Sequence, residues 1–195
     1  MTDADTADGV FPTVLVVDDE KEVADAYALR LRGLADMVTV YHGEDTIDAV
    51  RDRDTDVILL DRHMPGLSGD EVLRELRETD FSGRVVMVTA IDPGFDVLDM
   101  PFDDYLCKPV ERADIRAAVS QQCTILGYEV LGEYFAAEST RSVLEAEIPE
   151  SERANHEEFQ RVDARSTRLK QRARRLLPDA DTLFETFEGI EREGR

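Results

Sequence analysis

Five polar residues stand at the ends of short apolar runs, and their side chains suit the binding of a cation and an anion. They are Asp18, Asp19, Asp61, Thr89 and Lys108. Carboxylate oxygens are the ligands that hard divalent cations such as Mg²⁺ prefer. An ammonium group and a hydroxyl can hold the oxygens of an anion through hydrogen bonds. If these residues lie together, they form one small pocket with an excess of acid.

The apolar runs that precede these residues are typical of short strands buried on both faces. They cover residues 14–17, 57–60, 85–88 and 105–107, and a fifth apolar run covers residues 37–41. Strands that alternate with helices predict an α/β fold, with a parallel sheet and helices on both of its faces. The carboxyl ends of parallel strands converge at one edge, where open α/β sheets bind their ligands.

Helical periodicity predicts helices over residues 21–34 and 44–52 of the intervening segments. Ser68 and Glu71 have the spacing of a capping box, in which each side chain accepts a hydrogen bond from the backbone of the other. We therefore expect a third helix to begin there and to end near Thr79.

The order of these motifs resembles that of the receiver domains of two-component response regulators. The resemblance covers about residues 12–122 and rests on four motifs that close four strands. These motifs are Asp18-Asp19, Asp61 followed by Met64-Pro65-Gly66, Thr89-Ala90 and Lys108-Pro109. The resemblance implies a flavodoxin-like (βα)5 fold with the parallel strand order 2-1-3-4-5, in which the first and third strands are neighbours.

The resemblance also implies a role for each pocket residue. Asp61 would accept a phosphoryl group from a sensor histidine kinase, with Mg²⁺ offsetting the repulsion between two anions. The Mg²⁺ ligands would be Asp18, Asp19, Asp61 and the backbone carbonyl of His63. The residues that would bind the phosphate or switch are Thr89, Ala90, Tyr105, Lys108 and Pro109. Thr89 would turn toward the phosphate and open space for Tyr105 to rotate inward, and the Lys108–Pro109 bond is a candidate for a cis peptide.

One segment departs from the usual receiver pattern. Residues 91–101 contain Pro93, Gly94 and Pro101, which leave little room for the full fourth helix that receivers usually carry. We expect this helix to be short or irregular. That expectation puts in doubt the common dimer surface of the family, which uses helix four, strand five and helix five.

Taken singly, each pocket residue has an ordinary structural explanation, and only their joint order favours the pocket. Asp18 can cap a helix, and Lys108 can be a solvated charge. His63 is expected to be a solvent-facing turn residue, with a role in dephosphorylation as the alternative.

Two rival functions are a phosphorylation-independent protein-binding module and an enzyme of similar architecture. We expect no enzyme, because the first strand is followed by neither the Asp-x-Asp of haloacid-dehalogenase-type phosphatases nor a Gly-rich dinucleotide turn.

Beyond the receiver-like part, the apolar stripe of the fifth helix continues to about Glu147. A turn with Pro149 follows, and Ser151 is expected to cap a second long helix that runs to about Leu177. A last short helix is predicted over residues 182–190. Two long amphipathic helices around a proline turn predict an antiparallel, coiled-coil-like hairpin.

In composition, this tail resembles the HalX domain that follows receivers in haloarchaeal regulators. We therefore expect a disordered leader over residues 1–11, a receiver domain over 12–122 and a helical HalX-like output domain over 123–195. The resemblance suggests that the output changes a protein–protein or dimer contact and that the regulated process is transcription.

A stripe of arginines along the second long helix is the main charged feature of the tail. Its members are Arg161, Arg165, Arg168, Arg172 and Arg175, spaced three and four residues apart. Such a stripe could follow nucleic-acid phosphates or bind an acidic partner. The explanation that we favour is pairing with Glu138, Glu145 and Glu147 of the facing helix, or with glutamates of a second chain in a coiled-coil homodimer. No helix-turn-helix or zinc finger is recognisable, so the arginine stripe alone makes nucleic acid a candidate partner.

The composition limits the partners and the compartment. The 44 acidic and 23 basic residues give a net charge of −21, which opposes binding to nucleic acid and anionic membranes unless a local patch reverses it. High acidity with only three lysines is typical of a cytoplasmic protein from a salt-loving microbe, with an ordinary acidic bacterial protein as the alternative.

We expect no signal peptide and no membrane span. Cys107 and Cys123 lack a CxxC partner and are expected to stay reduced.

Overall fold

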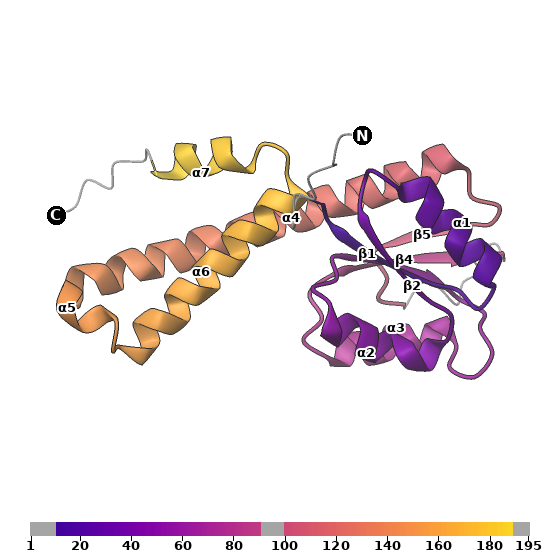
Figure 1. The fold of residues 1–195 in the computed structure, drawn as a ribbon, viewed down its shortest axis with the longest axis horizontal. Helices are drawn as coiled ribbons and strands as arrows, with labels where there is room; N and C mark the ends of the chain where they lie inside the picture. Colours follow the sequence, from indigo (N-terminus) through magenta and orange to yellow (C-terminus); the bar gives the residue numbers. More distant parts are fainter. Residues whose placement is uncertain (1–10, 91–99, 189–195) are drawn as a thin grey trace, which may run out of the picture. The chain divides into compact units, whose positions relative to one another are not determined.

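A computed structural model of the chain describes residues 11–90 and 100–188, which form two compact units (Figure 1). The first unit covers residues 11–123, and the second begins at Thr124. The expected leader falls almost wholly outside the described residues, as does most of the segment expected to hold a short or irregular fourth helix. Within the described ranges, no helix is both long and apolar enough to cross a membrane.

The first unit is built on a five-stranded parallel sheet with the order β2-β1-β3-β4-β5, which confirms the predicted fold class. The strands are β1 (Thr13–Val17), β2 (Asp36–Val40), β3 (Val57–Asp61), β4 (Arg84–Thr89) and β5 (Asp104–Cys107). The register pairs Val17 with Leu60, and it pairs Asp61 with Val88. The carboxyl ends of neighbouring strands are therefore nearly level, so the side chains that follow them can meet at one edge of the sheet.

Helices cover both faces of this sheet. They are α1 (Lys21–Leu31), the 3-10 turn η1 (Gly43–Asp45), α2 (Thr46–Asp52), α3 (Gly69–Glu78) and the start of α4 (Arg112–Glu147). Helices α2 and α3 lie on one side, and α1 and the start of α4 lie on the other (Figure 1).

The ends of two of these helices show how local sequence sets the boundaries. The predicted capping box of α3 is present: Ser68 Oγ accepts from the Glu71 N–H, and the Glu71 carboxylate accepts from the Ser68 N–H at 2.9 Å. Helix α1 ends at Leu31, earlier than the predicted Leu34. Gly33 has a φ of +76°, a left-handed conformation that glycine adopts without strain and that commonly ends a helix.

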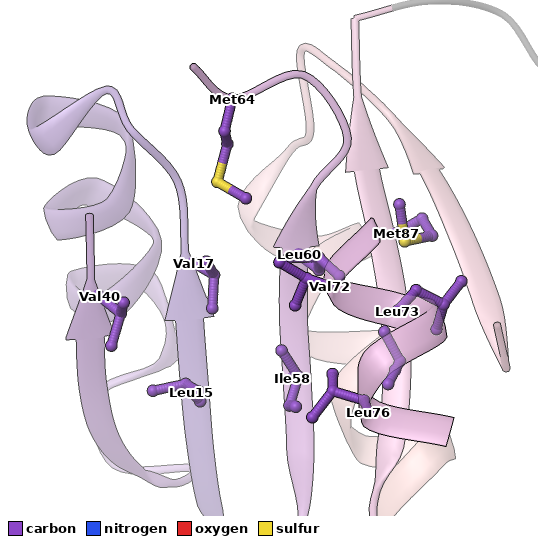
Figure 2. Close-up of a cluster of buried hydrophobic side chains, with 11 residues drawn as sticks. Leu15, Val17, Val40, Ile58, Leu60, Met64, Val72, Leu73, Leu76 and Met87 are labelled. Carbon is purple, nitrogen blue, oxygen red and sulfur yellow. The ribbon is translucent and has the colours of Figure 1, made fainter. Parts of the chain in front are cut away.

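The core of the first unit holds β3 in place. All five residues of β3 are buried, and Ile58 and Leu60 belong to one apolar cluster with Val72, Leu73 and Leu76 of α3 (Figure 2). Each large side chain buried in this way contributes about 1.5–3 kcal/mol to folding. Because the strand is fixed on both faces, the residue that closes it has a fixed position.

The second unit consists of helices that fold back on one another. Helix α4 is one unbroken helix to Glu147, and it is followed by α5 (Glu150–Arg153), α6 (Glu157–Leu176) and α7 (Ala180–Glu188). Helices α4 and α6 are antiparallel, since Arg165 contacts Glu133 while a Cβ on Gly127 would lie 2.5 Å from Leu177 Cγ. The predicted hairpin is therefore present.

The predicted cap at Ser151 is wrong. Ser151 lies inside α5, and the cap of α6 is His156, whose Nδ1 accepts from the Phe159 N–H at 3.4 Å. The extra turn has a physical reason: Arg153 donates to the carbonyl oxygens of Glu145 and Ile148, two of the groups that the end of α4 leaves without helical partners.

Candidate functional site

Three aspartates meet at the carboxyl edge of the sheet. Asp18 and Asp19 follow β1, Asp61 ends β3, and one carboxylate oxygen from each lies within 4.8 Å of the others. Asp18 and Asp61 are only 2% and 7% exposed. Like charges repel strongly at such distances, and more so where water is excluded. The cluster therefore requires positive charge nearby.

Lys108 supplies one positive charge from the end of β5. Its ammonium nitrogen lies 2.8 Å from Asp18 Oδ2 and 3.1 Å from Asp61 Oδ1. Its backbone N–H donates to the Thr89 carbonyl at 2.6 Å, which continues the pairing of β4 and β5. The Lys108–Pro109 peptide bond is cis, as the sequence predicts.

The ionisation of the pocket reflects this balance of charge. Burial raises the pKa of the Asp61 carboxyl, Lys108 partly opposes that rise, and the charges of Asp18 and Asp19 add to it. Burial alone would lower the pKa of Lys108. The hydrogen bond to Asp18 and the charge of Asp61 outweigh burial, so the pKa of Lys108 is raised and the ammonium stays charged. Lys108 therefore does not fully offset the cost of burying the Asp61 carboxylate.

The donor set fits a Mg²⁺ ion. All three side chains offer carboxylate oxygens, which a small hard cation prefers, and Mg²⁺ needs only a few protein ligands because it keeps several waters. The two buried carboxylates share the single positive charge of Lys108, and a divalent cation would offset the remaining cost of burying them. Asp18, Asp19 and Asp61 are thus the residues that could hold the metal.

Thr89 and His63 meet beside the acidic cluster. Thr89 ends β4 and is fully buried, and its Oγ1 lies 3.4 Å from His63 Nδ1. Sequence reasoning treated the His63 side chain as a solvent-facing turn residue. The ring is exposed, but it also contacts Thr89. No sequence pattern indicates that contact, because it depends on the path of the loop after β3.

The remaining residues expected to bind phosphate or switch lie at different depths. Ala90 is exposed directly after β4. Tyr105 is half-buried, pairs with Met87 in the register of β5, and has its ring centroid 5.6 Å from that of Phe102. Tyr105 therefore lies farther from the carboxyl edge of the sheet than Thr89 and Lys108 do.

Tyr27 of α1 is a neighbour of the pocket that the sequence motifs do not include. It is 5% exposed. Burial raises the pKa of its phenol, Lys108 lowers it, and the charge of Asp18 raises it further, so the phenol lies in the field of the pocket. In the sequence, Tyr27 lies at helical spacing from Leu31 and Leu34, and this spacing was the available signal for its inward position.

The arginine stripe of α6 lies in the second unit and is not uniform. Arg165 pairs with Glu133 at 3.1 Å, a glutamate outside the set that the sequence suggested. Arg161 and Arg168 are exposed, whereas Arg172 and Arg175 are half-buried. Glu138, one of the glutamates that the sequence suggested, accepts hydrogen bonds from Arg141 and Ser166.

Comparison with protein families identifies both parts of the chain. Residues 14–120 match the response regulator receiver domain, and residues 124–190 match the HalX domain. A Haloferax volcanii protein named as a candidate transcriptional regulator is 43% identical over 135 residues, which cover 68% of this chain and 23% of that protein. This haloarchaeal relative agrees with the acidic, lysine-poor composition expected of a salt-loving source.

Two further similarities support the first match. An uncharacterized transcriptional regulatory protein of Bacillus subtilis is 40% identical over 119 residues, which cover 57% of this chain and 52% of that protein. This chain thus spans about a quarter and about half of the lengths of the two relatives. The signal receiver domain of a candidate Luxo repressor protein from Vibrio parahaemolyticus superposes with a TM-score of 0.60 at 25% identity, covering 63% of this chain and 98% of that domain. The chain therefore belongs to the response regulator receiver family, and it carries a HalX domain after its receiver.

Proposed function

We propose that the protein is a phosphorylation-controlled regulator of a two-component system and that Asp61 accepts the phosphoryl group. The observation that carries this proposal is the position of Asp61 at the end of β3, 3.1 Å from the Lys108 ammonium and beside Asp18 and Asp19. A carboxylate in that position has a cation on one side and a metal-binding set on the other. Family membership adds support, because receivers interact with histidine kinases.

The transfer can be written for the residues of this chain. An Asp61 carboxylate oxygen attacks the phosphorus of a phosphohistidine on a sensor kinase. The phosphorus–nitrogen bond breaks, the imidazole leaves with the electron pair and is protonated, and Asp61 becomes an acyl phosphate. The Lys108 ammonium is placed to bind a charged oxygen of the transferred group.

A metal ion completes the charge balance of this proposal. Bound Mg²⁺ would be held by Asp18, Asp19, Asp61 and the backbone carbonyl of His63, and it would supply the positive charge that lets two anions meet. Lys108 meanwhile neutralises Asp18 and keeps that carboxylate directed into the pocket.

The same residues provide a switch. The Thr89 hydroxyl contacts His63 before phosphorylation, and it would turn toward a phosphate oxygen afterwards. Half-buried Tyr105 would rotate into the space that this motion opens, and Ala90 and Pro109 would line the phosphate. A change of this kind biases two surface states by the difference in their affinity for the phosphate.

We propose that the helical HalX domain is the output and that its contacts with protein or with a second copy regulate transcription. The names of the two relatives support that process. The proposed boundaries are a receiver over residues 12–122 and an output over residues 123–195, in a cytoplasmic protein that signals and does not turn over a substrate of its own. The matched family ranges support this division.

The deciding experiment is intact-mass spectrometry after treatment with acetyl phosphate in molar salt, with and without Mg²⁺. We expect a single phosphoryl adduct on the wild-type protein only when Mg²⁺ is present. Asp61→Asn should give no adduct, because it removes the attacking carboxylate. Asp70→Asn is the matched control, since Asp70 lies on α3 in an ion pair with Arg62, and it should be modified normally.

The absence of an adduct from a wild-type protein that is folded in the same salt would overturn the proposal. A phosphorylation-independent binding module would then be the better description of the receiver. An adduct that survives Asp61→Asn would assign the chemistry to another residue.

A further inference from the structure

One face of α4 in the second unit is apolar and open to solvent. Ile125, Tyr128 and Val143 are 37%, 54% and 60% exposed, and they are three of the five large hydrophobic side chains exposed in the described chain. Exposed apolar groups that gather in one place commonly mark a contact surface. We call this face the α4 stripe, and its members are Ile125, Tyr128, Gly132, Ala136, Ser139 and Val143.

Helix α4 already packs against α6 and α7, and the α4 stripe faces away from α6. The buried face of the same segment is formed by Leu126, Val130 and Ala137. With 100° between successive residues of a helix, those three and the stripe lie about half a turn apart. The contacts of α4 with α6 therefore leave the stripe uncovered.

Two glycines of α4 show that the stripe has no packing partner among the described residues. A Cβ on Gly127 would lie 2.5 Å from Leu177 Cγ, so packing against α6 accounts for that glycine. A Cβ on Gly132 would meet nothing within 4 Å. Glycine inside a helix is unfavourable relative to alanine, and within residues 11–90 and 100–188 no contact compensates for it at Gly132. Close approach by another backbone would explain why the position lacks a side chain.

We propose that the α4 stripe is the contact surface between two copies of this chain, packed with their α4 helices antiparallel. The stripe is self-complementary under a twofold axis midway between Gly132 and Ala136. Tyr128 of one copy would meet small Ser139 of the other, and Ile125 would meet Val143. Contacts between identical patches of this kind are the rule in homodimers.

Charge and size favour a second copy and set its affinity. None of the six residues is charged, although 34% of the chain is, so two molecules of net charge −21 can approach here with least repulsion. The stripe is about 27 Å long, given a rise of about 1.5 Å per residue. A single helix face of that length buries less surface than a standard stable interface. We therefore expect a weak dimer that forms at high protein concentration and dissociates on dilution.

Sedimentation velocity of the full chain in molar KCl tests the proposal without phosphorylation. We expect wild-type protein to shift from monomer to dimer as its concentration rises. Tyr128→Glu should stay monomeric, because it places a charge in each half of the contact. Leu29→Glu is the matched control: Leu29 is 61% exposed on α1, and its variant should dimerise like wild type.

Disulfide trapping then tests the antiparallel arrangement. In a Cys107→Ser background, which removes the exposed native thiol, Ile125→Cys and Val143→Cys are prepared separately and oxidised alone or mixed. We expect crosslinked dimers mainly in the mixture, because residue 125 of one copy meets residue 143 of the other. Efficient crosslinking of each variant alone would overturn the antiparallel arrangement.

Other outcomes would overturn the contact itself. Wild-type protein that stays monomeric at every concentration leaves the stripe without this partner, and a Tyr128→Glu variant that still dimerises places the contact elsewhere. The dimer elaborates the proposed output, but it is measured on unmodified protein. Its failure is therefore distinct from a failure of Asp61 to accept a phosphoryl group.

Discussion

Two clusters of partly or fully buried charge, one in each unit, differ in their balance of acid and base. The receiver pocket brings together Asp18, Asp19 and Asp61 with Lys108 as the neighbouring cation. In the helical unit, Glu138 accepts from Arg141 and from Ser166, and Arg141 also pairs with Glu145 at 2.6 Å.

The pKa values of one acid in each cluster, Asp61 and Glu138, shift in opposite directions. Burial, aided by the neighbouring carboxylates, raises the pKa of Asp61 despite the presence of Lys108. The hydrogen bond from Arg141 lowers the pKa of Glu138, with a smaller contribution from Ser166. A satisfied cluster of this kind stabilises its own fold, whereas an acid excess held in place by the fold is suited to binding a cation.

Of the variants that test this difference between the clusters, we expect Lys108→Met to change the free energy of unfolding most. Removing the cation leaves buried carboxylates unpaired, and we expect the free energy of unfolding to fall by about 3 kcal/mol in the presence of EDTA. Urea titration in molar salt measures the change. Added Mg²⁺ should recover more stability in this variant than in wild type, because it binds the folded protein and replaces the lost charge.

Lys21→Met is the control for that measurement. Lys21 is exposed, and its ammonium lies over the Tyr41 ring at 5.2 Å, so its loss should cost less than about 1 kcal/mol. A similarly small loss for Lys108→Met would show that water already screens the pocket carboxylates.

Neutralising one acid in each cluster should give effects of opposite sign. Asp61→Asn removes repulsion and should raise the free energy of unfolding by roughly 1 kcal/mol without Mg²⁺. Glu138→Gln weakens hydrogen bonds to a charged partner and should lower it by about 1.5 kcal/mol. Urea unfolding of both variants beside wild type is the measurement. Two changes of the same sign would remove the distinction between the clusters.

The sequence predicted the first cluster far better than the second. The pocket residues end buried strands, and a parallel sheet brings strand ends together whatever their separation in sequence, so motif order was sufficient. The pairing of Ser166 with Glu138 depends on how α6 is rotated against α4, and helical periodicity alone does not fix that rotation. The cap by His156 was missed for a related reason, since histidine is not a usual N-cap residue.

The contact between Thr89 and His63 marks the limit of prediction within the pocket itself. Strand ends fix the position of Thr89, but His63 lies in a loop whose path follows from tertiary packing. In the tail, the spacing of the arginine stripe was visible, yet only the structure shows that Arg165 meets Glu133. Periodicity identifies the face of a helix, and packing decides which residue the face meets.

The pH dependence of stability should also distinguish Asp61 from Glu138, although the effect is smaller. The folded pKa of Asp61 lies above its ordinary value of 3.8, so its contribution to stability decreases as pH rises from that value through the folded pKa. The folded pKa of Glu138 lies below 4.5, so its contribution is complete above that pH and is lost as pH falls through the folded pKa. The measurement is the free energy of unfolding of wild type, Asp61→Asn and Glu138→Gln between about pH 3 and pH 7, a range that spans ordinary carboxyl pKa values. The difference between wild type and each variant gives the pH dependence that the one acid contributes.

The smallest effect is expected from Ser166→Ala, which removes one of the two hydrogen-bonding partners of Glu138. Ser166 is 5% exposed, and its hydroxyl donates to Glu138 Oε2 at 2.8 Å across the hairpin. Arg141 still satisfies the carboxylate, so the loss should be only about 0.5–1 kcal/mol in urea unfolding. Ser142→Ala, which removes a hydroxyl bonded within α4, is the control and should cost less. Equal losses would mean that the bond between the helices adds nothing specific, and apolar contacts alone would then hold this part of the hairpin together.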